Sequence, residues 1–214
     1  MKLLKRIKRV MTTDTISSLE PKTSLFQIVM DKAKRHKRAG RYTSALNEFE
    51  HAATMVENDS DGVFWAMIAL HRVDIYIIQE MWEDADNLLK TLKQQAETRN
   101  NKTQLAYVYS AMGTQAQAKS DWNTTQSFYE KALETATEAF SIGAKGRAQG
   151  HLADVYLHQG NASYAVRLLS EALMHLEVSG DTELIVYFMG RLGIAQVETG
   201  QNSEGQQNLG RALR

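Results

Sequence analysis

Apolar and polar positions repeat along this chain with a constant period of 40. The first position of the repeat is aromatic in three copies and is occupied by Tyr42, Trp82, Trp122, Ala162 and Asn202. Three residues later every copy has a small residue, at Ala45, Ala85, Thr125, Ala165 and Gly205. Four residues further on each has a large apolar residue, at Phe49, Leu89, Tyr129, Leu169 and Leu209. Because these positions share one face of a helix with about 3.6 residues per turn, each copy is predicted to contain an amphipathic helix, at roughly 42–57 in the first copy.

A second helix is predicted before this one in each copy, at roughly 24–39 in the first. Its matching column is small in four copies of five, which lets two helix backbones approach closely: Ala33, Val73, Gly113, Ala153 and Gly193. Ser24 followed by Gln27 is typical of a capping box at the start of this helix. Glycine, which adopts the left-handed conformation at little cost, is expected to end it at Gly40, Gly160 and Gly200.

These patterns resemble the tetratricopeptide repeat (TPR) family over about residues 22–214. The second helices carry the small–large–small run of that family in Ala45, Phe49 and Ala52, and the first helix of copy four has Ala153 followed by Tyr156. The period of 40 exceeds the usual 34 by about six residues. The resemblance implies an all-α, right-handed α-solenoid of about five antiparallel helix pairs, the TPR-like repeat domain 21–214. The repeats are expected at about 22–60, 61–101, 102–141, 142–181 and 182–214, after a basic amphipathic N-terminal segment, 1–20.

The resemblance also implies a function, because the first helices of such repeats line a concave groove that holds another protein or peptide. The chain is therefore interpreted as a non-enzymatic interaction scaffold or adaptor. A regulatory sensor module of a transcriptional regulator is an alternative, weakened by the lack of a DNA-binding domain. By position, the groove residues would be Met30, Lys34, Lys37, Met67, Leu70, His71, Asp74, Tyr107, Arg147, His151, Asp154, Tyr187 and Arg191.

Charge is distributed unevenly, although the net formal charge is +0. Residues 1–41 contain 12 Lys and Arg against three acids. Five of these cations follow one side of a short amphipathic stretch, at Lys2, Lys5, Arg6, Lys8 and Arg9. They could contact an acidic partner or an anionic membrane surface, where each contributes about 1 kcal/mol. A membrane-peripheral assembly factor is therefore a second alternative. Nucleic acid is disfavoured as a partner because Tyr42 is the only aromatic residue beside the second basic run.

No residue pattern indicates an enzyme or a cofactor. The chain has no cysteine, which excludes disulfides, thiolate nucleophiles and Cys-based zinc sites and fits a cytoplasmic location. It also has no G-x-S-x-G, no phosphate-binding glycine loop and no H-E-x-x-H. Two His–Asp pairs, His71 with Asp74 and His151 with Asp154, have the i, i+3 spacing of neighbours on a helix. Copy three separates them, so they are interpreted as surface hydrogen bonds and not as a metal site.

The last repeat is predicted to be the least stable part of the repeat domain. Gly205 and Gly210 interrupt its second helix, and three amides lie between them. Such a helix would fray or be covered, because a terminal repeat normally needs a polar cap. Self-association through the C-terminal repeat, or a partner docked there, is the hypothesis that follows.

Overall fold

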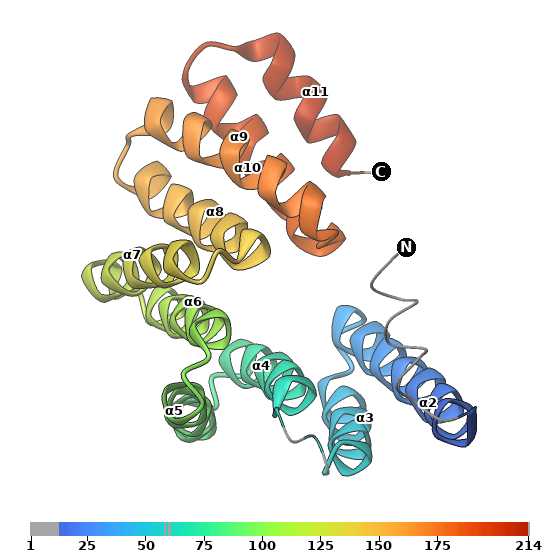
Figure 1. Ribbon diagram of the computed structural model, residues 1–214. Helices are drawn as coiled ribbons and strands as arrows, with labels where there is room; N and C mark the ends of the chain where they lie inside the picture. Colours follow the sequence, from blue (N-terminus) through green and yellow to red (C-terminus); the bar gives the residue numbers. More distant parts are fainter. Residues whose placement is uncertain (1–12, 58, 60, 214) are drawn as a thin grey trace. The chain divides into compact units, whose positions relative to one another are not determined.

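The computed structural model describes residues 13–57, 59 and 61–213 (Figure 1). Over these residues it has ten helices and no strand, which confirms the predicted all-α class. The helices are α2 (Thr13–Arg38), α3 (Tyr42–Met55), α4 (Val63–Ile78), α5 (Trp82–Thr98), α6 (Lys102–Ala118), α7 (Trp122–Glu138), α8 (Ile142–His158), α9 (Ala162–Ser179), α10 (Thr182–Glu198) and α11 (Asn202–Ala212). The chain forms two compact units, Met1–Ile75 and Tyr76–Arg214.

The predicted repeat period reappears in the places where the helices begin. The second helix of each pair begins at the first column of the repeat, at Tyr42, Trp82, Trp122, Ala162 and Asn202. Three of the first helices, α6, α8 and α10, begin at Lys102, Ile142 and Thr182, which again lie one period apart. The five-copy arrangement of helix pairs is therefore confirmed from the second helices, which keep the predicted register without an insertion.

The turn inside each pair has the expected left-handed residue. Gly40, Gly160 and Gly200 have φ of 68°, 75° and 83°, as predicted for helix-ending glycines. Glu80 and Ser120 occupy the same column and adopt the same conformation, with φ of 56° and 59°. The following N–H closes the turn by bonding back to the helix, as in Arg41 N to His36 O at 3.0 Å. This is the hydrogen-bond pattern of a Schellman motif, which satisfies carbonyls that the helix end leaves unpaired.

The first helix differs from its prediction at its N-terminus. α2 begins at Thr13, so Ser24 lies inside the helix and the capping-box interpretation of Ser24 and Gln27 is wrong. Side-chain caps occur instead at the starts of later helices. Asn101, Asp121, Asn161 and Asp181 each accept a hydrogen bond from the backbone N–H three residues on. The predicted contact residues Lys2, Lys5, Arg6, Lys8 and Arg9 lie outside the described residues.

Small residues allow close helix contacts inside the pairs, as the small column predicted. A methyl group on Gly113 would lie 2.5 Å from the ring of Tyr129, and one on Gly193 would lie 2.8 Å from the carbonyl oxygen of Gly205. α11 runs unbroken from Asn202 to Ala212, so the prediction that Gly205 and Gly210 interrupt it is wrong. Gly205 is buried where α11 meets α10.

Each unit has its own core. In the first unit, Met30 of α2 and Phe49 of α3 pack with Ile68 of α4. In the second, Tyr129 of α7, Leu169 of α9 and Phe188 of α10 belong to one cluster. The helices of the second unit contact one another in chain order from α5 to α11, and Figure 1 shows α8 to α11 side by side. The part of the chain that the structure describes contains no helix long and apolar enough to span a bilayer.

Candidate protein-binding surface

Three of the predicted groove residues of the first unit, Lys37, His71 and Asp74, form a cluster. Lys37 of α2 donates a 2.8 Å hydrogen bond from Nζ to Oδ2 of Asp74 on α4, and the same Nζ lies 3.4 Å from Nδ1 of His71. His71 Nδ1 is 3.8 Å from the Asp74 carboxylate. The His71 ring also stacks on Phe49 of α3, with centroids 5.3 Å apart and planes at 13°. The predicted neighbourhood of His71 and Asp74 is thus present, and Lys37 bridges it.

The contacts within the cluster determine the protonation states of Asp74 and His71. Burial acts to raise the pKa of the Asp74 carboxyl, but hydrogen bonding to His71 and the charge of Lys37 prevail and lower it below its ordinary value. Burial lowers the pKa of His71, and Lys37 adds to this effect while Asp74 opposes it. At neutral pH the cluster is therefore a carboxylate and an ammonium beside a neutral imidazole. Its ionic charges cancel, and the cluster offers an outside ligand little net attraction.

In the second unit Asp154 of α8 is the centre of a larger network. Its side chain is only 2% exposed, so the prediction of a surface hydrogen bond at this position is wrong. The hydroxyl of Tyr187 donates a 2.9 Å hydrogen bond to Oδ2, and Nε of Arg191 donates to Oδ1. Both donors come from α10, one repeat further on. Burial raises the pKa of the Asp154 carboxyl, whereas Arg191 and Tyr187 oppose the change.

His151 lies one turn before Asp154 and is enclosed by aromatic rings. Its ring stacks on Tyr129 of α7 at 5.1 Å and 8°, and meets Phe188 edge-on at 5.1 Å. The Tyr129 hydroxyl in turn donates to Gln117 Oε1 at 3.0 Å. Gly150 makes room for this packing, because a methyl group there would lie 2.3 Å from the Phe188 ring. The same repeat position thus stacks a histidine on the preceding second helix in copies two and four.

Arg147 of α8 makes a second set of contacts, with α6 and with the start of α10. Its guanidinium lies over the ring of Tyr107, 5.6 Å from the centroid, and one terminal nitrogen lies 3.2 Å from Oδ2 of Asp181. Arg147 and Tyr107 occupy the same position of copies four and three. Two sets of contacts therefore join predicted groove residues of α6, α8 and α10: Tyr107 with Arg147, and His151, Asp154, Tyr187 and Arg191 with one another.

Four predicted groove residues have other surroundings. Met30 is 1% exposed and belongs to the core of the first unit, so it offers nothing to a ligand. Met67 packs against the same core. Lys34 and Leu70 are half-buried. Within the described residues no group of three or more His, Asp or Glu side chains is placed to hold a metal ion.

Comparison with known proteins identifies the fold. No protein-family model and no curated protein matches the chain. Among solved structures, a Rap protein complexed with competence and sporulation factor superposes with a TM-score of 0.68 at 11% identity, covering 88% of this chain and 53% of that one. A signal transduction ATPase with a tetratricopeptide repeat sensor from Pyrococcus horikoshii gives 0.59 at 21%, covering 86% and 28%. The putative kinesin light chain TPR-like repeats of Podospora anserina give 0.53 at 16%, covering 88% and 93%. This chain has a TPR-like fold. It spans less than two-thirds of the length of the first two proteins.

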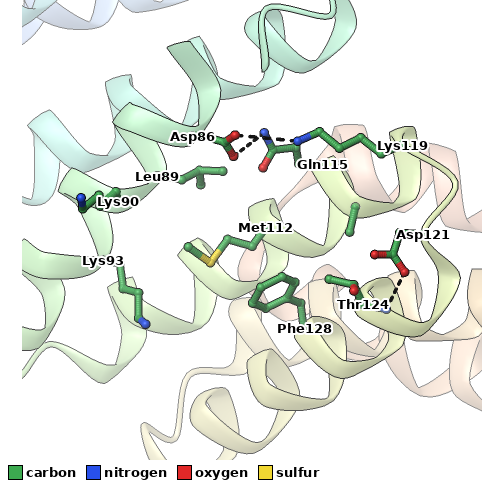
Figure 2. Close-up of a pocket in the computed structure, with 11 residues that line it drawn as sticks. Asp86, Leu89, Lys90, Lys93, Met112, Gln115, Lys119, Asp121, Thr124 and Phe128 are labelled. Atoms are coloured by element: carbon green, nitrogen blue, oxygen red, sulfur yellow. Dashed lines mark hydrogen bonds and ion pairs between the residues drawn. The ribbon is translucent and has the colours of Figure 1, made fainter. Parts of the chain in front are cut away.

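The TPR-like repeats of the second unit also form a groove that the sequence analysis did not anticipate. It has a volume of about 460 Å³ and lies between α5 and α7, with α6 as its floor (Figure 2). Half-buried Met112 and Phe128 supply apolar surface from α6 and α7, whereas the lining residue Leu89 of α5 is only 1% exposed. Lys90, Lys93 and Lys119 supply cations. Asp86 and Asp121 are among the other lining residues. Hereafter this is called the α5–α7 groove.

A sequence signal for the α5–α7 groove exists in the second helices. Asp86, Lys90 and Lys93 lie on one face of α5 outside the repeat columns, next to the column residue Leu89. The family resemblance places ligand-binding residues on the first helices, so this face of a second helix was not predicted to bind a ligand. Only the structure shows that they face Met112 and Phe128.

Proposed function

We propose that this chain is a non-enzymatic module that binds another protein or peptide on the first-helix surface of α6, α8 and α10. The observation that carries the proposal is that predicted groove residues of three successive repeats contact one another, Tyr107 with Arg147, and Tyr187 and Arg191 with the buried Asp154. Aromatic rings and arginines are the side chains that supply most binding energy in protein interfaces. The internal pairs hold them in place before a ligand arrives, which limits the entropy lost on binding.

The chemistry of this surface favours a ligand chosen by shape and aromatic contact more than by charge. Arg147 is paired with Asp181 and Arg191 with Asp154, so both guanidinium charges are already balanced. Tyr187 keeps 47% of its surface exposed although its hydroxyl is engaged. Its ring face and that of half-buried Tyr107 are available to apolar or backbone groups. A peptide with apolar side chains, extended or helical, suits such a surface.

The structural comparisons support a protein or peptide ligand without identifying it. The Rap protein superposes on this chain as a complex with competence and sporulation factor. We extend that type of interaction, but not that ligand, to the first-helix surface here.

The test begins with the identification of a ligand by affinity purification of the full chain from its native host, with mass spectrometry. The affinity of that ligand is then measured for the wild type and for Tyr107→Ala. We expect a loss of about tenfold, since removal of a central aromatic anchor costs on the order of 1–2 kcal/mol. Tyr187 is less suitable, because its removal would also free the buried Asp154.

The matched control is Phe140→Ala. Phe140 is 90% exposed, lies in the turn between α7 and α8 and takes no part in the contacts described among the six residues. Its removal takes away an aromatic ring of similar size and should leave the affinity unchanged. Equal affinities for the wild type and Tyr107→Ala, with both proteins folded by circular dichroism, would mean that the ligand binds elsewhere.

A further inference from the structure

The α5–α7 groove has an unbalanced charge, in contrast to the first-helix surface. Its two carboxylates are already engaged. Asp86 accepts a 2.9 Å hydrogen bond from Gln115 and lies 3.8 Å from Lys119 Nζ, while Asp121 caps α7 by accepting from the Thr124 N–H at 3.1 Å. Lys90, however, is exposed and pairs with no residue in the described part of the chain. The lining residues include three lysines and two aspartates, so the groove carries a net charge of +1.

Cations border the groove on both of its long sides. Lys90 and Lys93 lie on α5 (Figure 2). On the α7 side, Nζ of Lys131 lies 5.7 Å from the centroid of the Phe128 ring, which itself lines the groove. Lys93 is 3.6 Å from Glu97, an exposed pair of the kind that contributes little, on the order of 0–1 kcal/mol. The lysines can therefore turn towards a ligand at small cost.

The floor between these lysines is apolar. Figure 2 shows Met112 between Leu89 and Phe128, one residue from each of the three helices. Methionine has a flexible, polarisable side chain and adapts to apolar groups of different shape. The face of α5 from Asp86 to Lys93 covers eight residues, and the distance along the helix axis from the first to the last is about 10 Å at 1.5 Å per residue. That length matches two turns of a helix laid into the groove, with apolar residues about four positions apart.

We propose that the α5–α7 groove is a second binding site, which takes an acidic amphipathic helix of a partner protein. Its apolar side chains would contact the half-buried Met112 and Phe128. Its Asp or Glu residues would face Lys90 and Lys93 on one side and Lys131 on the other. The chain's own N-terminal residues do not fit this description, because residues 1–11 contain five Lys and Arg and no acid.

The test uses the full chain with ¹³C-methyl methionine and two synthetic peptides of about 18 residues, long enough to be helical. One consists of Glu, Ala and Leu, with Leu spaced for a single helix face; in the other every Glu is replaced by Lys. Met112 reports on the groove, and its methyl signal is assigned with Met112→Leu. Met174 of α9, which is 60% exposed, is the internal reference outside the groove. The acidic peptide should shift the Met112 signal and leave Met174 unchanged, whereas the lysine peptide should shift neither.

Reversal of a lysine's charge then tests the role of the lysines that border the groove. Lys90→Glu should lower the affinity for the acidic peptide by roughly three- to tenfold, the effect expected for exposed charges. Lys145→Glu on α8 is the matched control, because it reverses a lysine that does not line the groove, and it should have no effect. Tyr107→Ala should also leave this binding unchanged, so the outcome does not depend on the first-helix proposal.

Several outcomes would overturn the proposal. Equal shifts of Met112 and Met174, or equal binding of the two peptides, would show that association is unspecific. If Lys90→Glu and the wild type bound the acidic peptide with identical affinity, a role of the bordering lysines in binding would be excluded. Phosphatidylserine vesicles or oligouridine that shift Met112 in the absence of peptide would assign the groove to a membrane or a nucleic acid. Sedimentation showing concentration-dependent dimers that lose the Met112 shift would assign it to a second copy of the chain.

Discussion

At the scale of single residues, the histidine at one repeat position makes the same stacking contact in copies two and four. The aspartate one turn later has a different ionic partner in each of these copies. His71 stacks on Phe49 and His151 stacks on Tyr129, in each case on the second helix of the preceding repeat. The aspartate one turn later binds Lys37 from the preceding repeat in copy two, but Arg191 from the following repeat in copy four. The sequence shows the two aspartates at equivalent positions. It does not show which neighbour supplies the cation, because that depends on packing between repeats.

Phe140 has a backbone conformation that is unfavourable for a non-glycine residue. It has φ of 51°, a left-handed value, and its ring is 90% exposed. A non-glycine residue loses roughly 1–2 kcal/mol in this conformation, and exposed packing recovers little of it. Gly180 occupies the equivalent place after the next repeat, with φ of 78°.

We therefore expect Phe140→Gly to stabilise the protein by about 0.5–1 kcal/mol, after allowance for the added freedom of glycine in the unfolded chain. Urea unfolding of both proteins measures this difference. Phe140→Ala retains the left-handed cost and should change stability less. A lower unfolding free energy for Phe140→Gly would show that the exposed ring makes a stabilising contact.

At the scale of helices, the repeat columns predict second helices well and the first helix of the chain poorly. Each second helix begins at its first column because an apolar face starts there and a left-handed turn precedes it. For α2, the local signal of Ser24 and Gln27 indicated a start that the structure does not show, since the helix begins at Thr13. A capping motif is a local preference, and its presence does not force a helix to begin.

Glycines in α11 provide a matched pair for testing the contact with α10. A methyl group at Gly205 would lie 2.8 Å from the Gly193 carbonyl oxygen, whereas at Gly210 it would meet nothing within 4 Å. Gly205→Ala should therefore push the two helices apart and destabilise the protein by about 1–3 kcal/mol. Gly210→Ala should instead stabilise it by about 0.5–1 kcal/mol through helix propensity.

Thermal unfolding followed by circular dichroism compares the two variants under identical conditions. The opposite signs are the informative result, because both substitutions add the same methyl group to the same helix. Two variants that are both more stable than the wild type would contradict the close packing of Gly205 on Gly193.

At the scale of the whole molecule, candidate site prediction was limited by the geometry between repeats. The first-helix residues of copies three to five were predicted from position alone, and the structure shows contacts of Tyr107 with Arg147 and of Tyr187 and Arg191 with Asp154. Met30 of copy one was predicted by the same rule and is buried. The α5–α7 groove was not predicted, because it combines residues of two second helices and one first helix, and repeat position gives no measure of the space between them.

The same repeat-to-repeat architecture predicts a gradient of local stability in the second unit. α8 packs against α7 and α9, and also touches α6 and α10, whereas α11 packs chiefly against α10. In repeat proteins stability is approximately a sum over neighbouring interfaces, so a helix with one neighbour opens without disturbing the others. Backbone N–H groups of α11 should consequently exchange with solvent at least about tenfold faster than those of α8, which corresponds to about 1.4 kcal/mol.

Hydrogen exchange with mass spectrometry on the full chain measures this gradient helix by helix. Gly205→Ala should accelerate exchange in α11 and α10 and leave α6 and α7 unchanged, since the added methyl group acts only where α11 meets α10. Acceleration of equal size in every helix would show that the second unit opens all at once. Stability would then belong to the unit as a whole, and contacts between distant repeats would have to transmit the effect. The nearest-neighbour description of the fold would fail, even though each helix pair kept its place.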